Sequence, residues 1–107
     1  MMSLVNKLKI QGEIVNNKTV VHIGTLYAKP EHIDNLIQSF EGLKQAAGYI
    51  SHECYRDLEN NNKLTLVEQW KSKGDHENFV NSFPAEVMEQ WLGMLSQEGE
   101  DSYFEKL

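Results

Sequence analysis

The stretch "LTLVEQWKSK", residues 64–73, alternates its side chains with the two-residue period of a β-strand. The face that bears its two leucines also bears a carboxylate and an indole, in the order Leu64, Leu66, Glu68 and Trp70. A closed hydrocarbon core would leave that carboxylate without a partner, so we expect this face to look into a pocket or a polar seam between subunits. The alternative is structural: Trp70 fills the core and Glu68 pairs with Arg56 across the sheet.

This strand belongs to a short, acidic chain whose 107 residues suffice for one domain with one core. The 16 acidic and 10 basic residues give a formal charge of -6, which disfavours nucleic acid and anionic lipid as partners. No segment has the roughly 20 apolar residues of a membrane span, and no secretory signal is recognisable. Because Cys54 is the only cysteine, no internal disulfide can form, and we expect a cytoplasmic protein.

Upstream of this strand, the sequence predicts two further strands and a helix. Residues 19–29, "TVVHIGTLYAK", form a strong strand, and residues 7–15, "KLKIQGEIV", form a weak one. The weak strand belongs to an N-terminal extension, residues 1–18, which we expect to add an edge strand or to cross to a partner. A helix over residues 30–47 has proline at its first position, and Gly48 suits the left-handed residue that closes it.

Around and after residues 64–73, the pattern predicts a hairpin, two helices and a last strand. Residues 49–57, "YISHECYRD", pair with residues 63–71 through an Asn-rich loop. A short helix starts near Asp75, and a second helix covers "PAEVMEQWLGMLSQ", residues 84–97. After a polar gap, the segment "SYFEKL", residues 102–107, is expected to be a short terminal strand.

This order of elements is that of two βαβ-type halves with a hairpin between them. It predicts an α+β, ferredoxin-like domain over residues 19–107, in which helices cover one face of an antiparallel sheet. Both faces of the strand 19–29 are mostly apolar, because Val20 and Leu26 lie on one face and Val21 and Ile23 on the other. The second face therefore needs a cover, and a second copy of the same sheet is the simplest one, so we expect a homodimer.

Three segments, in this order and at these spacings, resemble the antibiotic biosynthesis monooxygenase family: "LYAKPEHIDNLIQSF", "GYISHECYRD" and "LTLVEQWKS". The resemblance covers residues 19–106. It implies a ferredoxin-like fold, a dimeric α+β barrel, and a pocket between sheet and helices in each subunit. It also implies one of the family's activities: oxidation of quinols or polycyclic phenols without metal or flavin, degradation of haem, or isomerisation of small sugar-derived molecules.

The chain departs from the family's patterns at several positions. Many members carry one histidine on the short helix and another just after it, where this sequence has Phe79 and Pro84. Haem-degrading members use an Asn, a Trp and a His, of which only the Trp is matched, by Trp70. The Asn position holds Gly24, and no histidine lies between Glu77 and Leu107. Haem needs an axial ligand, so these differences argue against haem degradation.

Histidines are the natural candidates for proton transfer near neutral pH. His22 and His52 lie within strands among apolar neighbours, whereas His32 and His76 lie on first turns of helices, where we expect solvent. We predict His22, His52 and Trp70 as catalytic residues, with Trp70 packing on the substrate ring. The side chains predicted to bind the substrate are mostly aromatic: Tyr55, Glu68, Phe79, Phe83 and Trp91.

No metal site is predicted. His52 and Cys54 point the same way on one strand, but two ligands do not make a site. Cys54 as a nucleophile has no neighbour in the sequence that would lower its pKa.

The predicted function is therefore a cofactor-independent monooxygenase that acts with dioxygen on a quinol-like or phenolic small molecule. The alternatives are a non-catalytic small-molecule-binding or stress-response module of the same fold and a small-molecule isomerase. Turnover separates the first alternative from the enzyme, and activity without dioxygen identifies the isomerase.

Overall fold

The computed structural model describes residues 19–107 of the chain, and the expected weak strand at residues 7–15 lies outside this part. The described elements follow the ferredoxin-like order. They are β2 (Val20–Ala28), η1 (Pro30–His32), α1 (Ile33–Ser39), η2 (Phe40–Gln45), β3 (Tyr49–Arg56), β4 (Lys63–Trp70), α2 (Lys73–Asn81), α3 (Ala85–Leu92) and β5 (Leu95–Glu105). The α+β class and the ferredoxin-like plan are thus confirmed.

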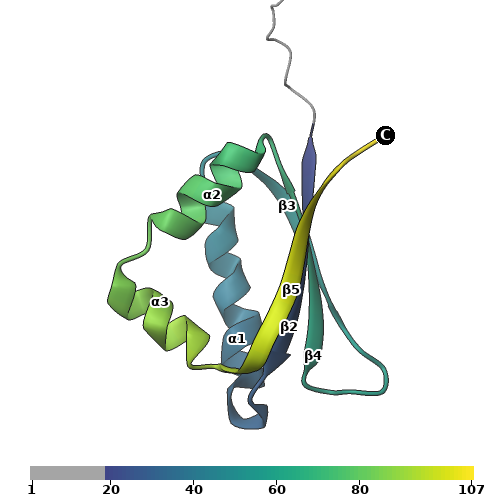
Figure 1. Cartoon of the computed structure of the whole chain (residues 1–107), viewed down its shortest axis with the longest axis vertical. Helices are drawn as coiled ribbons and strands as arrows, with labels where there is room; N and C mark the ends of the chain where they lie inside the picture. Colours follow the sequence, from purple (N-terminus) through teal and green to yellow (C-terminus); the bar gives the residue numbers. More distant parts are fainter. Residues whose placement is uncertain (1–18) are drawn as a thin grey trace, which may run out of the picture.

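The four strands form one antiparallel sheet in the order β3-β4-β2-β5. Within residues 19–107, α1, α2 and α3 all lie on one side of this sheet (Figure 1). The register places Glu68 of β4 opposite His22 of β2 on one side and His52 of β3 on the other. On the far side of β2, His22 lies opposite Tyr103 of β5. Residues opposite one another point to the same face, so four polar or ionisable side chains share the face under the helices.

The segment expected to be one helix over residues 30–47 is divided into two short 3-10 turns and a central α-helix, η1, α1 and η2. Its apolar spacing still docks it on the sheet, because Leu36, Phe40 and Leu43 are buried against Leu64 and Leu66. Gly48 has φ of 85°, the left-handed conformation expected after this segment, although the last helical turn already ends at Gln45.

The C-terminal boundaries differ from those expected. The helix predicted to reach residue 97 ends at Leu92, and β5 begins at Leu95 instead of residue 102. The residues interpreted as a polar gap are part of this strand, and Gly99 lies so close to β2 that a Cβ there would overlap the Thr25 carbonyl oxygen. The segment is polar because much of this edge strand faces solvent, which hides the two-residue apolar period.

The sheet face away from the helices, here called the open face, has no cover within residues 19–107 (Figure 1). The central strands place no charged side chain on this face between Val21 and Thr25 of β2 or between Thr65 and Gln69 of β4. Phe104 of β5, opposite Val21, is 50% exposed. In the described part of the chain, no helix is long and apolar enough to cross a membrane.

Candidate active site

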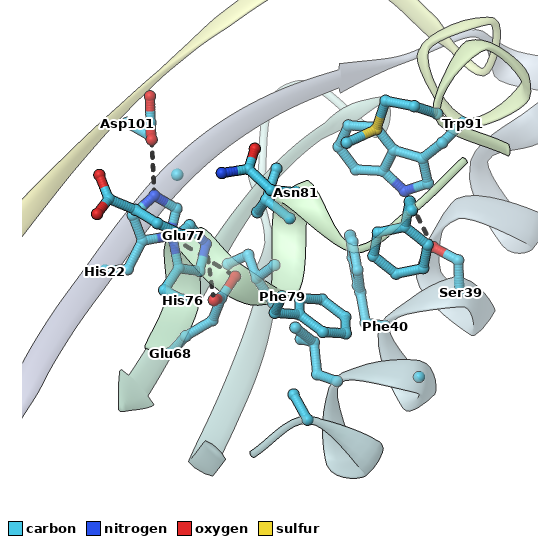
Figure 2. Close-up of a pocket in the computed structure, with 18 of the residues that line it drawn as sticks. His22, Ser39, Phe40, Glu68, His76, Glu77, Phe79, Asn81, Trp91 and Asp101 are labelled. Carbon is cyan, nitrogen blue, oxygen red and sulfur yellow. Dashed lines mark hydrogen bonds and ion pairs between the residues drawn. The ribbon is translucent and has the colours of Figure 1, made fainter. Parts of the chain in front are cut away.

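A cavity of about 1270 Å³ lies between the sheet and the helices. Its walls are largely apolar and include Phe40, Phe79 and Trp91. Its polar end holds His22, Glu68 and His76, which we call the His–Glu cluster. Figure 2 shows the cluster at one end of the cavity, Trp91 and Ser39 at the other, and Phe79 between them. An apolar cavity with few convergent polar groups has the usual character of a small-molecule site.

Glu68 is buried, with 3% of its surface exposed, because β4 carries it on the face under the helices. Its carboxylate accepts a hydrogen bond from the indole N–H of Trp70 at 2.7 Å. Arg56, the alternative partner expected across the sheet, is exposed and lies opposite Leu64. Glu68 therefore faces the two histidines, and the Trp70 indole holds its carboxylate in position, as expected for a polar pocket.

His22 is held from β2 between two carboxylates. Its Nε2 lies 2.7 Å from Asp101 Oδ2 of the edge strand β5, and its Nδ1 lies 3.7 Å from Glu68 Oε2. The second distance is too long for a hydrogen bond, so the buried Nδ1 has no hydrogen-bonding partner. Burial lowers the pKa of His22, but Glu68 and Asp101 outweigh it, and the pKa lies above its ordinary value of 6.5.

His76 reaches the cluster from the opposite side, from α2. The hydroxyl of Ser72 caps this helix by accepting a hydrogen bond from the backbone N–H of Asp75 at 3.0 Å. His76 Nδ1 lies 2.6 Å from the Tyr103 hydroxyl, and Nε2 lies 3.6 Å from Glu68 Oε1. Burial and then the charge of His22 lower the pKa of His76, despite the opposing charge of Glu68.

Aromatic contacts fix these rings in place. The rings of His22 and His76 stack with centroids 4.0 Å apart, and the Trp70 ring lies edge-on to His76 at 5.3 Å. Tyr103 contacts both imidazoles, and burial together with neighbouring carboxylates raises the pKa of its hydroxyl. The two neighbouring imidazoles thus have pKa values shifted in opposite directions, a pattern common in acid–base sites.

With this geometry defined, the comparisons with known proteins decide the family. The family model described as antibiotic biosynthesis monooxygenase matches residues 19–92. The chain belongs to the antibiotic biosynthesis monooxygenase family. No curated protein matches the sequence.

Solved structures share the fold of this family member. A conserved protein from Methanosarcina mazei has a TM-score of 0.69 at 23% identity, covering 86% of this chain and 96% of that one. The cofactor-independent oxygenase SnoaB from Streptomyces nogalater has a TM-score of 0.69 at 14% identity, covering 84% and 94%. The protein PA3566 from Pseudomonas aeruginosa has a TM-score of 0.68 at 18% identity, covering 87% and 98%. At these identities the similarity concerns the fold.

The structure brings together five of the residues predicted for the site. Of the predicted residues, those that line the cavity are His22, Glu68, Phe79, Phe83 and Trp91. Phe79 and Phe83 contact each other edge to face at 4.9 Å, and Trp91 bonds to the Ser39 hydroxyl at 3.3 Å. Phe79, which stands where many members of the antibiotic biosynthesis monooxygenase family have a histidine, therefore forms part of the apolar wall.

Three predicted residues lie outside the cavity. His52 lies on β3, the far edge of the sheet, where its Nδ1 pairs with the Tyr49 hydroxyl at 2.7 Å. Tyr55 is 53% exposed, and its hydroxyl donates to Glu53. Trp70 is completely buried behind His76 and Phe79, so it supports Glu68 and does not border the cavity. For His52 and Trp70, strand periodicity gives the face but not the distance from the cavity, whereas Tyr55 lies opposite Thr65 on the open face.

The expectation of a solvated His76 was wrong, since the residue is only 8% exposed. A position on the first turn of a helix does not tell which side of the helix packs against the sheet. Asp101 was not recognised as a neighbour of His22, because β5 was expected to start only at residue 102. The register that places Tyr103 of β5 opposite His22 was not predicted either. In the sequence, the signal was the alternation of Asp101, Tyr103 and Glu105 on one face.

Proposed function

We propose that this member of the antibiotic biosynthesis monooxygenase family oxidises a quinol-like or phenolic small molecule with dioxygen, without a cofactor in that reaction. The observation that carries the proposal is the position of the His–Glu cluster at the polar end of an apolar, aromatic-walled cavity. A flat ring can pack against Phe79, Phe83 and Trp91 while its hydroxyl reaches the cluster.

The cluster supplies the proton acceptor. An imidazole nitrogen of His22 or His76 takes the phenolic proton, and Glu68 balances the resulting positive charge. The phenolate left behind is electron-rich, and the apolar wall that includes Phe40 and Phe79 limits its contact with water. Asp101 and Tyr103 act as positioning residues, because each holds the outer nitrogen of one ring.

The substrate anion then reduces dioxygen without help from another redox group. One electron passes from the anion to dioxygen, and the two radicals combine to form a carbon–oxygen bond at a ring carbon that carries hydrogen. Cleavage of the oxygen–oxygen bond leaves one oxygen atom as a new carbonyl and releases the other as water. Phenol plus dioxygen gives quinone plus water, and the imidazole returns its proton to the departing oxygen.

The working form in this proposal is a homodimer in the cytoplasm. The central strands of the open face are uncharged from Val21 to Thr25 and from Thr65 to Gln69, and its carboxylates Glu53 and Glu100 lie on the edge strands, so two copies can meet over the centre of the face. Its apolar side chains include Val21, Ile23, Tyr27 and Val67, which a second sheet would remove from water. The free thiol of Cys54 fits a reducing compartment.

Oxygen-electrode measurements with a panel of quinols and polycyclic phenols test the proposal. Uptake above the rate of substrate autoxidation, with a quinone that carries one added oxygen atom and without hydrogen peroxide, supports a monooxygenase. Tight binding of these compounds without uptake would identify a binding module of the same fold instead. Conversion of a ligand in the absence of dioxygen would identify an isomerase.

A further inference from the structure

The His–Glu cluster has the composition of a metal site as well as that of a base. One ligand atom from each of His22, Glu68 and His76 can be chosen so that all three lie within 4.8 Å of one another, and all three residues are buried. His22 Nδ1 lies 3.7 Å from Glu68 Oε2, and His76 Nε2 lies 3.6 Å from the other carboxylate oxygen, Oε1. Two ligands bound tetrahedrally at metal distances of about 2.1 Å lie roughly 3.4 Å apart, so ligand atoms that lie up to 4.8 Å apart here draw together when an ion binds.

A second observation points to a ligand at this place. His22 Nδ1 is the one buried side-chain nitrogen or oxygen atom without a hydrogen-bonding partner in residues 19–107, and the residue is 93% buried, being 7% exposed. Because a carboxylate only accepts, the hydrogen bond from Nε2 to Asp101 places the ring proton on Nε2. In the neutral ring, Nδ1 then carries an unused lone pair, and it lies 3.7 Å from Glu68 Oε2.

Each of the three ligands also has an outer partner that fixes its orientation. Asp101 holds His22 at Nε2, the Tyr103 hydroxyl holds His76 at Nδ1, and the Trp70 indole holds Glu68 at Oε1. The inner atoms, His22 Nδ1, His76 Nε2 and Glu68 Oε2, remain for an ion. Metal-binding histidines and carboxylates usually have such outer hydrogen bonds.

We propose that His22 Nδ1, His76 Nε2 and Glu68 Oε2 form a binding site for a divalent first-row transition-metal ion that opens toward the cavity. Two imidazoles and one carboxylate suit zinc, iron, cobalt or nickel, whereas Mg²⁺ prefers oxygen ligands alone. The bound ion uses the same nitrogens that accept the proton in the proposed reaction. The metal-loaded form therefore lacks its base, and a metal ion regulates the site by inhibition, a consequence that rests on the proposed function.

Direct binding tests the metal site without reference to turnover. The full-length protein is freed of metal with a chelator and dialysed to equilibrium against Zn²⁺, with Mg²⁺ as the control ion. We expect one zinc ion and no magnesium ion per chain. Co²⁺ in place of zinc is expected to give the intense visible absorption of a four- or five-coordinate site.

Substitutions locate the ion. His22→Gln and His76→Gln are each expected to abolish the stoichiometric site, whereas His52→Gln, on the same sheet face but outside the cluster, is expected to retain it. Asp101→Asn leaves the ligands in place and is expected to weaken zinc binding by about 10–100-fold. Since the Asp101 side chain is 61% exposed, this variant is expected to keep the thermal unfolding temperature of the metal-free protein.

Absence of stoichiometric zinc binding by the wild-type protein would overturn the proposal, whatever the folding of the variants. Zinc binding that survives both His22→Gln and His76→Gln would place the ion elsewhere and overturn it equally. Because dialysis needs no substrate, an absence of zinc binding would overturn the metal site but leave the oxygenase proposal unaffected. Conversely, absence of oxygen uptake by the metal-free protein leaves the metal site standing.

Discussion

The indole N–H of Trp70 donates a hydrogen bond to Glu68 at 2.7 Å, and both side chains are almost completely buried on the same face of β4. This contact explains how a carboxylate shares a strand face with two leucines. It also shows that Trp70 is not part of the cavity wall. Its indole instead holds Glu68 in position.

Loss of this hydrogen bond should destabilise the fold measurably. We expect Trp70→Phe to lower the free energy of unfolding by about 1.5–3 kcal/mol, because a buried charged acceptor loses its donor. The matched control is Trp91→Phe, whose indole bonds to Ser39 at a longer distance of 3.3 Å. That change should cost roughly 1 kcal/mol or less. Urea unfolding of both variants measures the difference, and equal losses would contradict this role of Trp70.

Gly48, just before β3, lies against Asp75 of α2, the helix that carries His76. A Cβ at this position would lie within 2.5 Å of three Asp75 side-chain atoms, and the φ angle of 85° disfavours any other L-residue. We therefore expect Gly48→Ala to lower the free energy of unfolding by about 1–3 kcal/mol. Gly42→Ala, with nothing within 4 Å, should be neutral or slightly stabilising. Thermal unfolding compares the two variants, and similar behaviour would refute the argument.

The open face should carry the dimer interface. We expect the wild-type protein to scatter light as twice the chain mass of 12.3 kDa at micromolar concentration. Ile23→Glu places a charge at the centre of this face and should give monomers. Leu58→Glu, in a loop where the side chain is completely exposed, should remain dimeric. A monomeric wild-type protein, or a dimer unaffected by Ile23→Glu, would exclude this interface.

Cys54 should be a slow nucleophile. Burial raises the pKa of its thiol above the ordinary value of 9.0, with Arg56 opposing the shift. Less thiolate is therefore present at neutral pH, and alkylation by iodoacetamide should be slower than for the unfolded chain. The rate should reach half its maximum above pH 9.0. A half-maximum below that pH would show an activated cysteine and contradict the expectation that nothing lowers the pKa of the Cys54 thiol.

The fold was largely predictable because its strongest signals are local. Strand alternation at residues 64–70 and the Pro30 helix start gave the elements, and the order of elements gave the ferredoxin-like plan. The start of β5 was missed because an edge strand with Glu98 and Glu100 lacks an apolar period.

The site was predictable only in part, for a different physical reason. Apolar neighbours within a strand singled out both His22 and His52, but this pattern does not tell how far along the sheet the helices leave a cavity. His76 could not be assigned, because the docking direction of α2 depends on tertiary contacts such as the one with Tyr103.

The most direct test of the proposed chemistry is oxygen uptake by metal-free protein with a quinol substrate, comparing His22→Gln, His76→Gln and the matched control His52→Gln. If the His–Glu cluster accepts the substrate proton, at least one of the first two variants should lose about 100-fold or more in kcat while His52→Gln keeps the wild-type rate. Wild-type rates in both His22→Gln and His76→Gln would contradict the assignment of the reaction to this cluster.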